Sequence, residues 1–214
     1  MTTPPSTFED SYRRGEPPWV IDQPQPAVVE LERSGGLTGP VLDLGCGTGE
    51  HTVLLARLGY RVLGADAAPA AIERARERAR AAGVAAEFTV ADAMDPSALG
   101  RFATVLDSAL FHVFGADDRA RYARALTDVV DPGGQVIVLA LSTRGPAFGP
   151  QIDDDAVPAA FAPPDWTVEG LAATTYRGRV THADQAIATG SALGELVDLP
   201  AVLARIQRGR DGAD

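Results

Sequence analysis

The sequence contains a group of closely spaced glycines followed by an acid, a pattern that indicates ligand binding. The glycines lie in residues 41–49, which read VLDLGCGTG. The acid, Asp66, follows about 20 residues further along. Glycines let the backbone approach a ligand closely, and a carboxylate after the next strand can accept hydrogen bonds from both hydroxyls of a ribose. The pattern therefore predicts a site that binds a nucleoside cofactor.

The spacing of these glycines distinguishes between two kinds of nucleoside cofactor. A dinucleotide site has the pattern G-x-G-x-x-G, which would place a glycine at position 50, where this chain has Glu50. A carboxylate there would repel a pyrophosphate bound at the start of the following helix. S-adenosylmethionine (SAM) carries no pyrophosphate, so the run G-x-G-x-G followed by Glu50 favours SAM. An ordinary turn of the same fold, without a ligand, is the alternative.

The other residues expected to bind the cofactor surround the glycine turn and the ends of neighbouring strands. Asp43 can orient the turn or meet the amino group of the methionine moiety, and Cys46 is interpreted as a small space-filling residue. Asp92 can accept a hydrogen bond from the adenine amino group while the amide of Ala93 reaches a ring nitrogen. Asp66 and Asp92 are alternatively helix caps or loop acids. The expected set is Asp43, Gly45, Cys46, Gly47, Asp66, Ala67, Asp92, Ala93, Asp107 and Ser108.

His112 is the candidate for proton transfer, with Asp107 as a second one. Residues 107–112 follow a predicted strand and face the same end of the sheet as the glycine turn. A histidine has an ordinary pKa that suits proton acceptance near neutrality. His112 is equally well interpreted as a packing residue between aromatic neighbours. The acids at 153–155 are interpreted as solvated or as a helix cap, and no metal site is predicted.

Composition limits the classes of function. The chain of 214 residues has a formal net charge of −10, which argues against a nucleic-acid partner. No apolar run approaches the ~20 residues that a membrane span needs, and the N-terminus lacks the layout of a secretory signal. A single cysteine permits no internal disulfide, so we expect a cytoplasmic protein. All 19 basic residues are arginine, which together with abundant alanine indicates a GC-rich bacterial genome. We expect a monomer or homodimer with a small-molecule partner.

Apolar runs alternate with helical patterns from residue 39 to about residue 141. The predicted strands are 40–44, 61–65, 86–90, 103–107 and 135–141, and the predicted helices are 50–58, 69–82 and 117–130. A loop with a short helix around 154–161 precedes two final strands, 166–176 and 199–207. We therefore predict an α/β, Rossmann-like, doubly wound, seven-stranded and mostly parallel sheet with an antiparallel edge hairpin and helices on both faces. Residues 179–195 give no clear pattern.

The N-terminal segment before the first strand is stiff and rich in proline around Trp19. Residues 8–26 are compatible with a disordered tail or an interaction motif. An ordered segment that folds over the cofactor as a lid and excludes water is the third interpretation.

The sequence resembles the class I SAM-dependent methyltransferases over nearly its whole length. Within them it is similar to small bacterial enzymes related to thiopurine, halide/thiol and heterocyclic-toxin methyltransferases. Residues 17–26 resemble the P-P-W-D-I-G-x-P-Q-P of those proteins, and residues 41–49 and 105–114 carry the rest. The resemblance implies in-line transfer of a methyl group to S, N or O of a small molecule, and it places Trp19 beside the cofactor. A catalytically inactive protein that binds SAM or S-adenosylhomocysteine is the alternative.

Two residues depart from that pattern. Val20 stands where the family usually has Asp, and Asp22 stands where it usually has Gly. The resemblance thus implies an N-terminal lid segment and lead-in helix in residues 1–38 and a SAM-dependent methyltransferase domain in residues 39–214. These two departures affect how the lid closes. They therefore bear on the class of acceptor more than on the identity of the cofactor.

Overall fold

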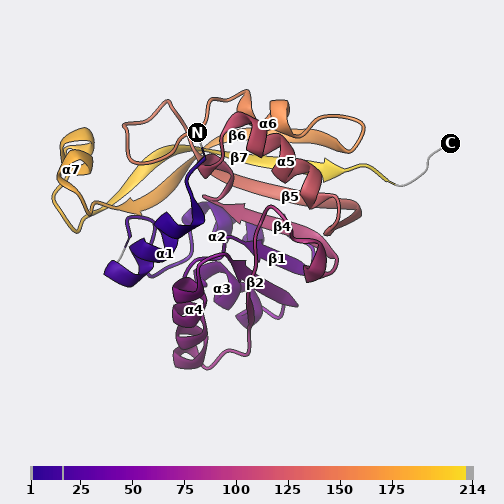
Figure 1. Cartoon of the computed structure of the whole chain (residues 1–214), viewed down its shortest axis with the longest axis horizontal. Helices are drawn as coiled ribbons and strands as arrows, with labels where there is room; N and C mark the ends of the chain where they lie inside the picture. The colour runs from indigo at the N-terminus through magenta and orange to yellow at the C-terminus, as the bar shows by residue number, and fades with distance from the viewer. Residues whose placement is uncertain (1, 16, 211–214) are drawn as a thin grey trace.

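A single sheet of seven strands forms the centre of the computed structural model, which describes residues 2–15 and 17–210 (Figure 1). Its strand order is β3-β2-β1-β4-β5-β7-β6. Strands β1 to β5 run parallel, whereas β7 is antiparallel to both β5 and β6. This arrangement confirms the predicted Rossmann-like sheet with its antiparallel edge hairpin. The strands are β1 Val41–Leu44, β2 Val62–Asp66, β3 Glu87–Val90, β4 Phe102–Ser108, β5 Val130–Leu141, β6 Trp166–Arg179 and β7 Leu196–Arg208.

Helices cover both faces of the sheet because its central strands are apolar on both sides. Successive residues of a strand point to opposite faces. Val105 of β4 belongs to one buried cluster together with residues of α5 and α6, whereas its neighbour Leu106 belongs to a second cluster together with residues of α2 and α3. The helices are α1 Pro5–Arg14, α2 Pro26–Arg33, α3 Glu50–Arg57, α4 Pro69–Ala82, α5 Ala116–Leu126, α6 Ala156–Ala160 and α7 Ala183–Thr189.

The predicted helices agree with the structure at α3 and α4, and the short helix expected around 154–161 is α6. α4 begins at Pro69 and ends before Gly83, whose left-handed φ of 64° closes the helix. The helix predicted for 117–130 is too long, because α5 ends at Leu126 and Val130 pairs with Phe102 at the start of β5. The sequence predicts one lead-in helix, without bounds, within residues 1–38, whereas the described residues of this segment form two, α1 and α2; α7 was not predicted.

Among the described residues, no helix has both the length and the apolar character that crossing a membrane requires.

The N-terminal segment packs against the rest of the fold. α1 lies beside α4, where the carboxylate of Glu9 accepts a hydrogen bond from the backbone amide of Ala70 at 3.0 Å. The chain then crosses the carboxyl end of the sheet and enters α2 at Pro26. This path places residues 8–15 and 17–25 above the ends of β1, β2 and β4, at the edge of the sheet where ligands of such folds bind.

Candidate functional site

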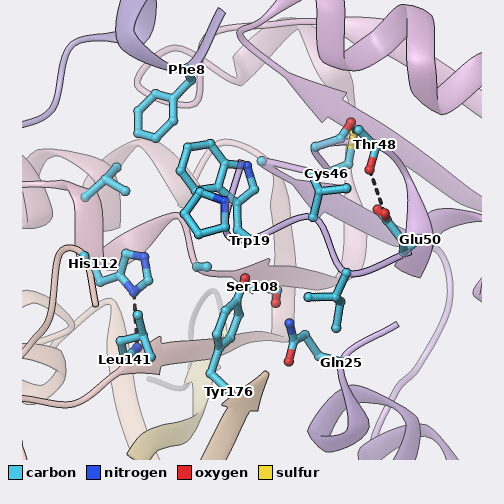
Figure 2. A pocket seen from close by; sticks show the side chains of 18 of the residues that line it. Phe8, Trp19, Gln25, Cys46, Thr48, Glu50, Ser108, His112, Leu141 and Tyr176 are labelled. Carbon is cyan, nitrogen blue, oxygen red and sulfur yellow. Dashed lines mark hydrogen bonds between the residues drawn. The ribbon is translucent and has the colours of Figure 1, made fainter. Parts of the chain in front are cut away.

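A cavity of about 250 Å³ lies between the N-terminal segment and the carboxyl ends of the strands (Figure 2). Its floor and walls come from the glycine turn, the start of α3, the end of β4, residues 148–150 and Tyr176 of β6. The N-terminal segment supplies its roof through Phe8, Tyr12, Pro18, Trp19, Val20, Ile21, Gln23 and Gln25. Residues that are far apart in the sequence therefore meet around one cavity.

The glycine turn keeps its backbone open to the cavity. Gly45 and Gly47 both line it and have φ values of 75° and 54°, in the left-handed region that glycine tolerates. A Cβ atom at position 47 would lie 2.8 Å from the hydroxyl oxygen of Tyr12. Only glycine fits between the turn and α1 there. Cys46 also lines the cavity, and burial raises the pKa of its thiol well above the ordinary value.

Asp66 reaches the cavity from the end of β2, as the sequence predicts. Its Oδ2 accepts a hydrogen bond from the amide of Gly47 and its Oδ1 accepts one from the amide of Ala68, both at 2.9 Å. Burial raises the pKa of this carboxyl, and the two amide bonds oppose that shift. A carboxylate oxygen can accept more than one hydrogen bond. Asp66 thus stabilises the turn and retains acceptor capacity toward the cavity.

Asp43 and Asp107 are buried side chains that do not line the cavity. Asp43 accepts a hydrogen bond from the hydroxyl of Thr52 at 2.5 Å. Asp107 accepts bonds from the amides of Leu110 and Phe111, both at 3.0 Å, and from the hydroxyl of Tyr122 at 2.8 Å. Burial raises the pKa of each carboxyl to about 6. Their bonds fix the turns after β1 and β4.

Three other residues predicted to bind the cofactor lie outside the cavity lining. Asp92 is exposed and accepts a hydrogen bond from the amide of Met94 at 2.8 Å. Ala67 is exposed, and Ala93 is buried against one apolar cluster. The contact of Asp92 and Ala93 with adenine stays a prediction. Ser108 does line the cavity, and its buried hydroxyl has no hydrogen-bond partner among the described residues.

His112 lies at the end of the cavity opposite Glu50 (Figure 2). It sits in a short 3₁₀ turn, Phe111–Val113, which follows β4. Its Nδ1 accepts a hydrogen bond from the backbone amide of Leu141 at 3.1 Å. Burial lowers the pKa of its imidazole to about 3, with a further contribution from the charge of Arg119. The ring is therefore neutral at neutral pH.

The N-terminal roof is held by polar contacts that the sequence did not reveal. The indole Nε1 of Trp19 donates to the hydroxyl of Tyr12 at 2.8 Å. Asp22 has a left-handed φ of 60°, which suits the glycine usual there in the resembling proteins, and its carboxylate pairs with Arg78 and Arg179 at 3.1 and 3.4 Å. The departure at position 22 thus adds a link between the roof and the domain below it.

The end of the roof is attached through Gln25 and His51. The amide of Gln25 donates to Nε2 of His51 at 3.0 Å. The side chain of Gln25 forms two further bonds, both 2.8 Å long, with the backbone of Arg177 in β6. Burial lowers the pKa of His51 to about 4. His51 of α3 is thus a buried anchor of the roof.

The His51 contact predicts a loss of stability in mild acid. The folded state holds His51 neutral down to about pH 4, whereas the unfolded chain protonates it below its ordinary pKa of 6.5. The contribution of His51 to the free energy of unfolding is therefore fully present above pH 6.5 and decreases as the pH falls toward 4. At pH 5 the loss is about 2 kcal/mol. Denaturant unfolding should show that difference between the wild type and His51→Gln when pH 7 and pH 5 are compared.

Asp43 and Asp107, with raised pKa values, shift the stability of both proteins in the opposite direction, so their contribution cancels in the comparison. The same substitution at exposed His182 is the matched control. If the free energies of unfolding of the wild type and of His51→Gln changed equally between pH 7 and pH 5, His51 would not be held neutral.

The charges around the cavity fit a cationic cofactor. Glu50 and Asp66 are the acids among its lining residues, and no arginine is among the described residues that line it. The cofactor predicted from the sequence carries a positive sulfur. The polar groups of SAM need hydrogen-bond partners. The cavity offers the open glycine turn, a carboxylate with spare acceptor capacity and the unpartnered hydroxyl of Ser108. The residues present therefore fit SAM.

Known proteins similar to this chain are methyltransferases. Residues 41–134 match the family model described as "Methyltransferase domain". The chain is 39% identical to the 2-heptyl-1-hydroxyquinolin-4(1H)-one methyltransferase of Mycobacteroides abscessus, over 68% of this chain and 67% of that protein. It is 28% identical to "Probable thiol methyltransferase 2" of Arabidopsis thaliana, over 67% of this chain and 65% of that protein.

A solved structure extends this similarity to most of the chain. It is described as "Conversion of a Disulfide Bond into a Thioacetal Group during Echinomycin Biosynthesis" and is 36% identical to this chain. The TM-score is 0.86, and the match covers 97% of this chain and 93% of that one. The similarity therefore includes the N-terminal segment as well as the sheet.

Proposed function

The chain belongs to the class I SAM-dependent methyltransferases, and we propose that it transfers a methyl group to a sulfur, nitrogen or oxygen atom of a small, largely apolar molecule. The observation that carries the proposal is the cavity at the carboxyl ends of the strands, with its apolar wall. Phe8, Val113, Leu141 and Phe148 line it, and Trp19 lies in its roof. The cofactor has to share this cavity with the acceptor, so the acceptor has to be small. The names of the two curated relatives, a hydroxyquinolone and a thiol methyltransferase, support the same class.

Each part of the cavity has a separate task in this proposal. SAM, when bound, supplies a methyl group on a positively charged sulfur. The glycine turn and Asp66 hold the cofactor, with Asp66 accepting from its ribose. Ser108 offers a hydroxyl between the turn and the opposite end of the cavity. The roof excludes water, and a dry apolar wall favours a reaction in which a negative acceptor and a positive sulfur become neutral.

Binding of the right cofactor is the first test of this function. In calorimetric titration the protein should bind SAM and S-adenosylhomocysteine and should not bind NAD, because Glu50 occupies the place where a pyrophosphate would lie. Mass spectrometry should then detect a methylated product from a panel of thiols, phenols and aza-heterocycles. NAD binding without SAM binding would contradict the cofactor argument. SAM binding without any product would favour the inactive binding protein.

A further inference from the structure

The imidazole of His112 has a fixed tautomer. Leu141 is buried, and its backbone amide needs an acceptor because an unpaired buried amide is costly. Nδ1 of His112 is that acceptor, at 3.1 Å (Figure 2). A nitrogen that accepts a hydrogen bond carries no proton. A neutral imidazole has a single N–H, so the proton resides on Nε2.

This tautomer makes His112 unable to act as a base from its present position. A base must accept a proton on a ring nitrogen, but Nδ1 is occupied by the Leu141 amide and Nε2 already carries a hydrogen. Burial further opposes a charged ring, since it lowers the pKa of His112 to about 3. The other nearby candidate, Asp107, directs its carboxylate to Leu110, Phe111 and Tyr122. Neither residue offers a free base to the cavity.

We infer that His112 is a hydrogen-bond donor of the acceptor site and that the acceptor arrives already ionised, as a thiolate, an acidic phenolate or the anion of an N-hydroxy heterocycle. The inference rests on the proposed function and specifies its acceptor. Nε2–H is the group that His112 can present to a ligand in the cavity, and it pairs with a lone pair. Hydrogen bonds to an anion are roughly twice as strong as those between neutral groups.

The charges along the cavity agree with an anionic acceptor at this end. Arg119 of α5 has its guanidinium carbon 5.3 Å from the centre of the ring of Phe111, the residue before His112. Its positive charge acts on His112, as the lowered histidine pKa shows. The acids Glu50 and Asp66 lie by the glycine turn. Glu50 is paired with Arg78 at 2.8 Å, which leaves Asp66 as the acid by the turn that has no salt bridge among the described residues, while the charge of Arg119 favours an anion at the His112 end.

The reaction is balanced without a base. The lone pair of the acceptor anion forms the new bond to the methyl carbon, and the electron pair of the broken carbon–sulfur bond stays on the sulfur. The negative and positive charges cancel, and no proton has to leave. His112 orients the anion through Nε2–H and keeps its own proton throughout.

The tautomer is tested directly by ¹⁵N NMR of histidine-labelled full-length protein at pH 7. His112, assigned by the loss of its signals in His112→Gln, should be neutral with its proton on Nε2. A proton on Nδ1, or a charged ring, would overturn the inference. This measurement needs neither an acceptor nor a variant that preserves activity.

The donor role is tested by binding of 4-nitrophenolate to the complex with S-adenosylhomocysteine, at a pH where the phenol is fully ionised. His112→Phe should weaken binding about 10-fold or more, because a donor to a charged group is lost. His112→Gln should bind nearly as well as the wild type, since its amide can accept from Leu141 and donate to the ligand. Nitrobenzene, which lacks the anionic oxygen, is the control and should bind both variants alike.

The pattern of results separates this inference from the proposed function. Equal 4-nitrophenolate affinity in the wild type and His112→Phe, or no binding to either, would refute the donor role while leaving SAM binding intact. Transfer to 4-nitrophenol that is lost in His112→Phe below the pKa of the phenol and fully restored above it would make His112 a base. Absence of SAM binding would instead refute the proposed function.

Discussion

Removal of residues 1–22 should leave the seven-stranded sheet folded and lower the rate of methyl transfer by roughly 10²-fold or more. These residues supply much of the roof of the cavity, including Tyr12 and Trp19. Without them the site is open to water and the acceptor loses one wall. The large apolar clusters on the two faces of the sheet consist mainly of residues from α2 onward. The circular dichroism spectrum should therefore still show a folded protein, while the rate of methyl transfer to the best acceptor of the panel falls.

Hydrogen exchange tests whether the roof orders further when the cofactor binds. Backbone amides of residues 17–22 should exchange more slowly in the presence of S-adenosylhomocysteine. Arg14→Ala, on the exposed side of α1, is the matched control for the truncation and should retain the wild-type rate of methyl transfer. Equal exchange with and without the ligand would argue against a lid. An unchanged rate after truncation would show that the roof has no part in transfer.

The sequence predicted the sheet well because its signals are local. β1, β2 and β4 contain short apolar runs, β5 ends in one, and the glycines at 45, 47 and 49 mark the turn into α3. Asp66 could be placed because it ends a strand next to that turn. The same local signals failed at α1, where polar residues prevail, and at α7, which has only seven residues. Both helices have contacts with distant parts of the chain, through Glu9 and Gln185.

The direction of individual acids could not be predicted, because the central strands are apolar on both faces. Asp43 alternates with Leu42 and Leu44, so it points to the opposite face and meets Thr52 of α3. Asp107 shares a face with Val105 and meets Tyr122 of α5. Continuous apolar runs do not tell which helix will cover which face. The sequence therefore identified the acids without their partners.

Contacts between distant segments set the rest of the site. Gln25 joins His51 and the backbone of Arg177, which is 152 positions further along the chain. The tautomer of His112 depends on an amide in another strand, 29 positions away. No local pattern encodes either contact. A proton-transfer role and a packing role for His112 were therefore indistinguishable from the sequence, and the hydrogen-bond donor that we propose is a third role.

Asp66→Ala should weaken SAM binding at least ~10-fold. The carboxylate of Asp66 lines the cavity while accepting from the amides of Gly47 and Ala68, and we expect it to accept from both ribose hydroxyls as well. Each hydrogen bond to a charged acceptor contributes about 1.5–3 kcal/mol. Water replaces the lost acceptor in part, so the lower end of that range applies. Calorimetric titration with SAM measures the effect, and 1.4 kcal/mol corresponds to about 10-fold in affinity.

The neighbouring acid provides the comparison that makes this result specific. Asp92→Ala removes an exposed carboxylate at the end of β3 that bonds only the amide of Met94 among the described residues. If the cavity is the ribose site, Asp66→Ala should have the larger effect, and any loss in Asp92→Ala would report the predicted contact with adenine. Because Asp66 also stabilises the glycine turn, thermal unfolding must show that the variant is folded. A folded Asp66→Ala protein with wild-type affinity for SAM would make Asp66 a purely structural acid and would move the cofactor away from the turn.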